Sequence, residues 1–265
     1  MSRDSISRFQ VVTVAVALLI AVFIVMVLIG VVTHSPLPVL IESLLSEEIQ
    51  FAIRLSIITS VISTLLCILV AVPVAYALTR YTFPGKTVVN MLMDIPMALP
   101  PLVAGVGLLL FFGVSPIGKS LAAAGLTFVF TPLGIIMAQF FVNLPYMLRV
   151  TRSTFQGVNP RYEHVAKTLG CTDAQAFWRV TLPMSFNGLL AGSVITWSKG
   201  IGEFGAALML AGATRMKTET LPLSLFLNMS TGKLEYAISA ATILIVISII
   251  SLYVFERYSG TAHVY

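Results

Sequence analysis

Residues 9–32 read FQVVTVAVALLIAVFIVMVLIGVV and carry no charged side chain. A run of this length is enough, as a helix, to cross the roughly 30 Å of hydrocarbon in a bilayer. Lipid offers no partner for free backbone amides, so such a run should be helical. Arg3 and Arg8 precede it as in a signal peptide, but the run exceeds a usual signal core and no small-residue cleavage site follows. We therefore expect a first membrane span at 9–32.

The composition of the whole chain agrees with this start. Of 265 residues, 57% are apolar and 10% charged, and the mean hydropathy is +0.96. A soluble domain carries about 25% charged residues, so this chain has too little polar surface for a water-exposed globule. The 18 Gly and 13 Pro follow no period, which excludes a collagen-like chain, and the aromatic share excludes a disordered one. These proportions predict a polytopic membrane protein.

Five further stretches are long and apolar enough to cross, which predicts an all-α membrane protein with six transmembrane helices. They are residues 53–78, 91–113, 131–148, 189–211 and 237–255. Two shorter apolar pieces, 121–130 and 221–229, are expected as interfacial or re-entrant elements on the outer side. Kinks are expected at the prolines of the spans, because each removes a backbone donor. These prolines are Pro73, Pro96, Pro100, Pro101 and Pro132.

The basic residues predict the orientation. With the amino terminus inside, ten of the sixteen Lys and Arg lie on the cytoplasmic side and five outside, with Lys199 in a span. This bias predicts a multi-pass plasma-membrane protein with both termini in the cytoplasm. The expected organisation is an amino-terminal helix and external loop (1–50), a transmembrane core (51–256) with a cytoplasmic loop at about 150–187, and a short cytoplasmic tail (257–265).

The cytoplasmic loop has clear helix signals. Asn159 followed by Pro160 is typical of a helix start, and Gly170 of a helix end. Thr172 can cap a second short helix that ends before Pro183. The expected product is a helix hairpin at the membrane surface.

One face of the first helix of this hairpin is modestly amphipathic, since Tyr162, Ala166 and Leu169 share it. From these residues alone, the hairpin could be a surface helix anchored on lipid headgroups or an element that contacts a partner.

The spacing within the loop favours the second alternative. Residues 163–170 read EHVAKTLG, and nine residues later 180–183 read VTLP. This resembles the cytoplasmic EAA loop of permease subunits of ATP-binding-cassette (ABC) importers: Glu-Ala-Ala, three residues, Gly, nine residues, an aliphatic residue, any residue, Leu-Pro. The opening triplet differs, because it reads His-Val-Ala at 164–166 with the acid one position earlier, at Glu163.

In that family the loop is a coupling helix that sits in a groove of the ATPase subunit, and the resemblance implies the same role for residues 159–178. The implied coupling residues are Asn159, Pro160, Glu163, His164, Ala166, Leu169, Gly170, Leu182 and Pro183. The resemblance also implies the type I ABC importer transmembrane fold and a permease homodimer with the path between its copies. Two ATPase subunits would bind ATP and Mg, so this chain needs no cofactor, and an extracytoplasmic binding protein would deliver the substrate.

A second resemblance concerns the substrate. Residues 197–206 read WSKGIGEFGA, followed by LAG at 210–212 and KTETLP at 217–222. These runs, with LPPLVAG at 99–105, look like the molybdate and tungstate permeases. Sulfate permeases of the same branch usually have Tyr in place of Phe204 and Ser in place of Ala206. The resemblance implies a molybdate or tungstate permease, with sulfate or another oxyanion as the alternative.

Five residues of the fifth span are candidates for the substrate path: Thr196, Lys199, Gly200, Glu203 and Gly205. Lys199 and Glu203 are four residues apart on one expected helix and could pair. Such a pair has two possible roles. It either lines the path of an oxyanion, or its two charges neutralise each other and fix the packing of the fifth helix. Small residues recur every four positions from Gly188 to Gly200, which suits either close packing or a narrow pathway.

Other signals support no further function. Residues 113–120, GVSPIGKS, satisfy the phosphate-loop pattern but follow a span rather than a strand. The three histidines (His34, His164, His263) and the two cysteines (Cys67, Cys171) show no ligand spacing, so we expect no metal site, disulfide or catalytic set. The orientation rule accounts for the basic residues, so no nucleic-acid binding is expected.

Two other classes of function were weighed. A secondary transporter would need intramembrane ion sites, and beyond Lys199, Glu203 and Asp94 there are few candidates. Asp94 itself is expected to be a hydrated boundary residue. A membrane scaffold would not require the spacing from Gly170 to Pro183.

Overall fold

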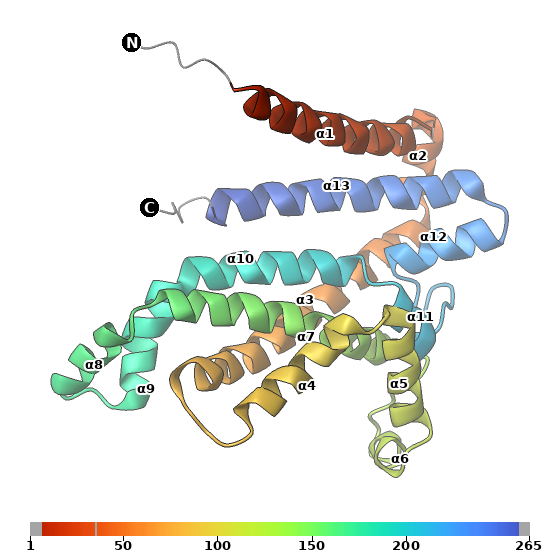
Figure 1. Ribbon diagram of the computed structural model, residues 1–265. Helices are drawn as coiled ribbons and strands as arrows, with labels where there is room; N and C mark the ends of the chain where they lie inside the picture. The colour runs from red at the N-terminus through yellow and green to blue at the C-terminus, as the bar shows by residue number, and fades with distance from the viewer. Residues whose placement is uncertain (1–6, 35, 260–265) are drawn as a thin grey trace.

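The computed structural model describes residues 7–34 and 36–259, and the regular structure of this part is helical. The long helices lie roughly side by side (Figure 1). In chain order the helices are α1 (Arg8–His34), α2 (Leu37–Leu45), α3 (Glu47–Arg80), α4 (Lys86–Ala98), α5 (Pro101–Gly113), α6 (Pro116–Ala123), α7 (Pro132–Gly157), α8 (Pro160–Thr168), α9 (Asp173–Ala176), the π-helix η1 (Phe177–Thr181), α10 (Leu182–Ile201), α11 (Gly205–Ala211), α12 (Leu221–Ser230) and α13 (Leu234–Ser259).

Four helices in this part of the chain are long and apolar enough to span a membrane: α1, α3, α7 and α13. They confirm the predicted spans at 9–32, 53–78, 131–148 and 237–255. α3 continues through Pro73, and Pro132 begins α7 instead of kinking it. A proline in the first turn loses nothing, because the amide it lacks would have no partner there.

The third predicted span, 91–113, bends at two of the prolines where a kink was expected, but the bend is a break between two helices. α4 and α5 form a pair bent by 111°, so they are a broken span or a re-entrant loop. Leu99 and Pro100 are extended, with ψ of 140° and 134°. A residue before proline avoids the helical conformation, and two successive prolines extend that constraint over two residues. The break therefore follows from Pro100 and Pro101.

The fifth predicted span, 189–211, is also broken. α10 ends at Ile201, and α11 begins only at Gly205. α10 is not among the candidate spans found in the described residues. It packs against α3, α7 and α13, so much of its surface meets protein. The sequence predicts six spans, whereas four helices qualify, or five when the bent pair counts as one.

The two broken segments meet each other, because α5 packs on α11. A Cβ added at Gly105 would lie 2.8 Å from Ala206 Cα, and one added at Gly205 would lie 2.9 Å from Pro101 Cβ. Backbones approach this closely only where side chains are missing. The contact therefore joins the motifs 99–105 and 197–206 and forms part of a buried apolar cluster with Ala104, Leu108 and Leu210.

A second close contact joins α7 and α10. A Cβ on Gly188 would lie 2.5 Å from Thr154 Cγ2, and one on Gly192 would lie 2.7 Å from Val150 Cγ1. Thr196 and Gly200 are buried further along the same side of α10. This row of small residues therefore serves packing along most of the helix.

Several smaller expectations are settled here. Residues 221–229 form a separate short helix, α12, and residues 121–130 leave helix α6 after Ala123. Their expected position at the outer membrane surface stays a prediction. In the segment 113–120 the backbone amide of Gly118 is bonded to the Ser115 hydroxyl and a helix precedes the segment, so it does not form a phosphate loop. Cys67 and Cys171 are free thiols. Arg3, His263 and residues 260–265 of the expected tail lie outside the described residues.

We expect Gly192→Ala to lower the stability of the bundle by about 1–3 kcal/mol, because overpacking forces the two helices apart. Thermal unfolding of the detergent-purified protein measures this. Gly107→Ala is the matched control, since a Cβ there meets nothing within 4 Å, and it should be neutral or slightly stabilising. The double variant Gly192→Ala with Val150→Ala should recover part of the loss. Equal unfolding temperatures for the two glycine variants would contradict the close contact.

Candidate functional site

The hairpin between α7 and α10 begins as the sequence predicts. Asn159 caps α8, and its side chain accepts a hydrogen bond of 3.0 Å from the amide of Arg161. Pro160 is the first helical residue. Gly170 ends the helix with φ of +92°, a left-handed conformation that favours glycine. The amide of Cys171 then bonds back to the carbonyl of Ala166.

The second half of the hairpin differs from the prediction. Thr172 and Gln175 form a capping box that starts α9, as expected from Thr172. The helix does not end before Pro183, however, because it passes through the π-turn η1 directly into α10. Pro183 stands in the first turn of α10, where its missing amide is tolerated. Helical structure therefore runs without a break from Asp173 to Ile201, from the hairpin into the bundle.

A buried carboxylate holds the hairpin to the bundle. Glu163 is only 3% exposed. Its Oε1 accepts bonds of 2.7 Å from both Arg80 Nε and the Thr181 hydroxyl, and its Oε2 accepts one of 3.0 Å from the Tyr76 hydroxyl. Arg80 and Tyr76 belong to α3, and Thr181 belongs to η1. Glu163 therefore joins three segments that are far apart in the sequence.

Arg80 extends this network to the end of α7. Its Nη2 donates to the carbonyls of Phe155 and Val158, at 3.1 and 2.9 Å. The Tyr76 ring packs edge-on against Phe155 and Phe177. The base of the hairpin thus combines a satisfied ion pair with aromatic packing, and both hold α8 at a fixed angle to α3.

The hydrogen bonds set the charge state of Glu163. Burial alone would raise the pKa of this carboxyl, but donation from Thr181, Arg80 and Tyr76 outweighs burial and holds the pKa below the ordinary value. The Arg80 charge acts in the same direction. Glu163 is therefore ionised at neutral pH and directed into the protein.

A pocket lies beside these contacts. It has a volume of about 740 Å³ and lies between α3 and the segment α9–η1, with Val72, Tyr81, Phe177 and Trp178 among its lining residues. Near the tip, Lys167 forms an ion pair with Asp173. The Lys167 side chain is 40% exposed and the Asp173 side chain is 63% exposed. The Glu163 network at the base, rather than contact along its whole length, fixes the hairpin.

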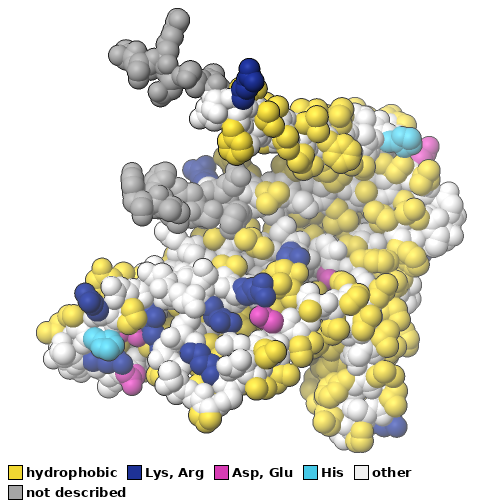
Figure 2. All heavy atoms as spheres, in the orientation of Figure 1, with side chains coloured by type: hydrophobic (Ala, Val, Ile, Leu, Met, Phe, Trp, Pro, Cys, Tyr) yellow, Lys and Arg dark blue, Asp and Glu magenta, His cyan; other side chains and the backbone are white. Residues whose placement is uncertain are grey.

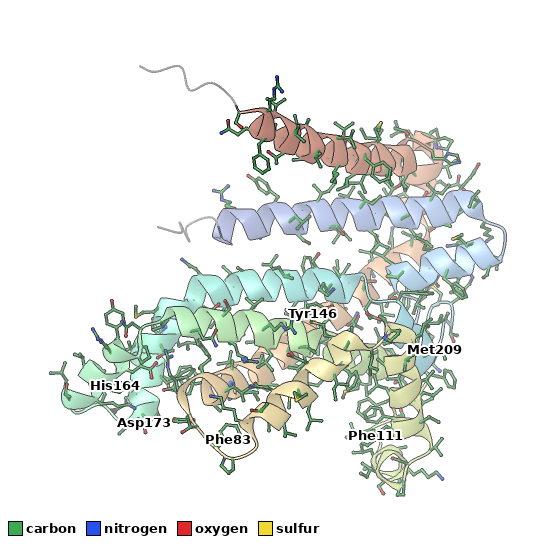
Figure 3. The ribbon with its side chains drawn as sticks, viewed as in Figure 1. Phe83, Phe111, Tyr146, His164, Asp173 and Met209 are labelled. Carbon is green, nitrogen blue, oxygen red and sulfur yellow. The ribbon has the colours of Figure 1, made fainter. Side chains whose placement is uncertain are left out.

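One exposed side of α8 is apolar. Tyr162, Val165 and Leu169 are 54%, 57% and 81% exposed, and their spacing places them on one side of α8. Trp178 on η1 is 64% exposed. We call Tyr162, Val165 and Leu169 the apolar face, whereas Trp178 borders the pocket beside α3. Of the other predicted coupling residues, His164 and Pro183 are exposed (Figure 3 for His164), and Ala166 and Leu182 are half-buried.

The predicted Lys199–Glu203 pair does not form. Glu203 lies beyond the end of α10, is 8% exposed, and accepts a bond of 2.8 Å from the amide of Ala206. Lys199 is exposed, and its Nζ lies 4.0 Å from the centre of the Tyr146 ring. The pairing was wrong because it assumed one unbroken helix through Gly202. The break turns the carboxylate onto α11 and leaves the ammonium on the surface.

The other predicted path residues lie inside the protomer. Thr196 donates to the Gly192 carbonyl, and Gly200 packs against Asn143 and Ser60. Gly205 lies against α5. Of the five candidates only Lys199 is exposed. Among the described residues, no group of three His, Cys, Asp or Glu side chains is placed to hold a metal ion.

Comparison with known proteins decides the family. The model of the binding-protein-dependent transport system inner membrane component matches residues 63–260. The chain belongs to this family. The matched part includes the hairpin, all the residues of the Glu163 network and Lys199.

Relatives of this inner membrane component include two kinds of permease. The sulfate transport system permease protein CysT of Salmonella typhimurium is 36% identical over 180 residues, 68% of this chain, and this chain spans less than two thirds (65%) of that protein's length. The molybdenum transport system permease protein ModB of Mycobacterium tuberculosis is 35% identical over 230 residues, which is 86% of each chain.

Solved structures give the fold. A chain of a bacterial alginate ABC transporter, in complex with an alginate pentasaccharide-bound periplasmic protein, has a TM-score of 0.73 at 16% identity, covering 96% of this chain and 93% of that one. A chain of the MetNI methionine ABC transporter in an inward-facing conformation has a TM-score of 0.61 at 16% identity, covering 82% and 98%. This likeness confirms the expected transmembrane fold of type I ABC importers.

Sequence reasoning missed the partners of the predicted residues. Arg80 was counted only for orientation, and Tyr76, Thr181 and Tyr146 were not singled out. Arg80 and Glu163 are 83 positions apart, and no local pattern links them. One signal was available: Arg80 is a charge directly after an apolar run, where an ion-pair partner is needed if the end is buried.

We expect Glu163→Ala to loosen the hairpin, because removing one partner of a buried ion pair costs about 3–5 kcal/mol. Amide hydrogen exchange of residues 159–181 in the purified protein should become faster by about a hundredfold or more. Asp173→Asn is the matched control, since the exposed pair that it breaks is worth about 1 kcal/mol or less. A similar acceleration in both variants would show that Glu163 is not the anchor.

The lowered pKa of Glu163 predicts a pH dependence. Because the folded pKa is below the unfolded one, of about 4.3, the stabilisation is fully present above that unfolded value and is lost as pH falls through the folded pKa. The stability difference between wild type and Glu163→Gln should therefore stay constant from pH 8 to pH 5 and shrink only below about pH 4. Thermal unfolding at a series of pH values measures it. A difference that shrinks near pH 6 would contradict the assigned charge state.

Proposed function

We propose that the chain is the permease subunit of an ATP-driven importer of a tetrahedral oxyanion, with molybdate or tungstate as the preferred substrate. The family membership supports the import function, and the relatives named above carry sulfate or molybdenum in their names. The preference for molybdate or tungstate rests on the run at 197–206. Nucleotide and Mg would bind to separate ATPase subunits, and an extracytoplasmic protein would deliver the anion.

The observation that carries this proposal is the apolar face of the hairpin. Large apolar side chains exposed beyond the ends of the spans indicate a protein interface or contact with the membrane surface. Here the buried base at Glu163 fixes the hairpin and presents Leu169 outward at 81% exposure. A fixed helix with one exposed apolar side fits a groove on a partner. We assign that groove to the ATPase subunit and place residues 150–187 as the coupling loop.

The position of Lys199 supports a path along the protomer surface. Tyr146, over which Lys199 lies, is near the middle of α7 (Figure 3). Tyr146 also lies near the inner end of the predicted span 131–148, and an ammonium facing lipid there is unfavourable, although it costs less than the roughly 3 kcal/mol expected at the bilayer centre. This face would therefore be covered by water or by a second copy, as in a homodimer with the path between the protomers.

The geometry also suggests how the ATPase would drive the path. Helical structure is continuous from Asp173 to Ile201, so a displacement of the hairpin moves α10 and Lys199 with it. Closure of two ATPase subunits would bring the two hairpins together and turn the helices attached to them. The hairpin, the start of α1 and the end of α13 lie at the same end of the bundle (Figure 1). All three would be cytoplasmic, within the domain limits predicted from the sequence.

Sulfate is the second candidate, because sulfate permeases are among the relatives. The two positions that distinguish the branches in sequence are packing positions here. Phe204 lies 5.6 Å from Phe226 between ring centres, and Ala206 is fully buried beside Gly105. Phe204 and Ala206 therefore distinguish the sequences of the two branches, and a transport measurement decides which anion is carried.

The test is transport by the reconstituted complex, with the ATPase subunits and the binding protein, in liposomes. We expect molybdate and tungstate to stimulate ATP hydrolysis and to accumulate inside, with sulfate weaker. Leu169→Asp should abolish both activities, since a buried charge at an interface costs several kcal/mol.

Ile117→Asp is the matched control, because Ile117 is 58% exposed on α6, outside the hairpin. It should leave ATPase assembly intact. Stimulation by sulfate alone would overturn the substrate preference. Normal assembly and transport by Leu169→Asp would overturn the assigned role of the hairpin.

A further inference from the structure

A row of charged side chains crosses the face formed by α4, α7 and α10 (Figure 2). Lys199 of α10 lies over the ring of Tyr146 on α7. Arg149 follows Tyr146 by three residues, so it shares that side of the helix about 4.5 Å further along the axis. Arg149 Nη2 in turn lies 3.3 Å from Asp94 Oδ2 on α4. The exposed side chains of Lys199 and Arg149 thus lie at positions about one helical turn apart along α7.

The pair of Arg149 and Asp94 is weak. It consists of a single contact of 3.3 Å between side chains that are 54% and 35% exposed, and such pairs contribute little. Asp94 Oδ1 is buried without a hydrogen-bond partner among the described residues, as is Asn90 Oδ1 one turn earlier on α4. Asp94 therefore neutralises Arg149 without fixing it. A tetrahedral dianion, with two charges and several acceptor oxygens, can compete for the guanidinium.

We propose that Lys199 and Arg149 are two successive binding positions for the transported oxyanion, and that Asp94 is the counter-ion to which Arg149 returns when the anion leaves. This rests on the proposed function and names the anion-contacting residues of that path. A path must bind an ion well enough to admit it and weakly enough to release it. Two uncompensated cations would hold a dianion too tightly, and Asp94 limits this by competing for one of them.

The position of the two cations fits a movement toward the hairpin, which the proposed function places in the cytoplasm. Lys199 of α10 lies over Tyr146 of α7, and Arg149 is one turn nearer to the hairpin. Arg152, three residues further, continues the row, and its Nε is buried without a partner in the described part of the chain. The anion would therefore meet positive charge at each turn of α7 on its way in.

The test uses the complete complex with ATPase subunits and binding protein, and tungstate as the probe. Arg149→Gln and Lys199→Gln should each lower maximal uptake by about tenfold, as expected for loss of one charge-assisted contact. Arg149→Lys should keep most of the uptake because it keeps the charge. Asp94→Asn should raise the tungstate retained in equilibrium dialysis, without binding protein, by about fivefold. Adding Arg149→Gln to Asp94→Asn should remove that gain.

Lys119→Gln is the matched control, because it removes an exposed cation from α6 outside this face, and its uptake should equal that of wild type. Wild-type uptake by Arg149→Gln and Lys199→Gln, or wild-type tungstate retention by Asp94→Asn, overturns the assignment and leaves the oxyanion importer intact. If Arg149→Gln does not assemble, the retention by Asp94→Asn decides alone. Failure of the wild-type complex to take up any oxyanion while it hydrolyses ATP overturns the proposed function and this assignment together.

Discussion

The buried carboxylate of Glu163 determines how the hairpin between α7 and α10 packs on the membrane helices. An ionised group that is 3% exposed is tolerable only when its lone pairs are satisfied, and here three donors from α3 and η1 satisfy it. Once α8 is fixed, its apolar side can only face outward. The orientation of α9 and of the π-turn follows, because Thr181 must reach the same carboxylate.

A related arrangement closes the other end of the bundle. Arg215 lies 2.6 Å from Glu48 at the start of α3 and 3.6 Å from Glu219, which is fully buried. It also donates to Asn228 of α12. Both ends of α3 are therefore held by an arginine and carboxylates, whereas the middle of the bundle relies on close approach of small residues. Directional polar contacts thus lie near the ends of α3, where water can reach some of the atoms.

The sequence predicted the helical class, four of the spans and the caps of the hairpin, because these depend on local patterns. Asn159, Gly170 and Thr172 start or end helices through contacts within one helical turn, so the adjacent residues in the sequence are enough to predict these helix ends. A kink at Pro100 was expected from the proline itself, but the sharpness of that bend and the break at Gly202 were missed because average hydropathy does not register a change of direction. Two contacts depend on which helices become neighbours: Arg80 with Glu163, and Lys199 with Tyr146. The spacing of residues along the sequence does not predict which helices will be neighbours. The same limit explains the wrong pairing of Lys199 with Glu203.

The position of α1 has a consequence for biosynthesis. α1 has no buried residue, and its main contact is with α13, the last helix of the chain. During synthesis the first span therefore enters the bilayer long before its neighbour exists, and it must remain stable as a solitary lipid-surrounded helix. Its uninterrupted apolar sequence meets that requirement. Association of α1 with α13 is then a late step of assembly, because it can begin only after α13 has been synthesised.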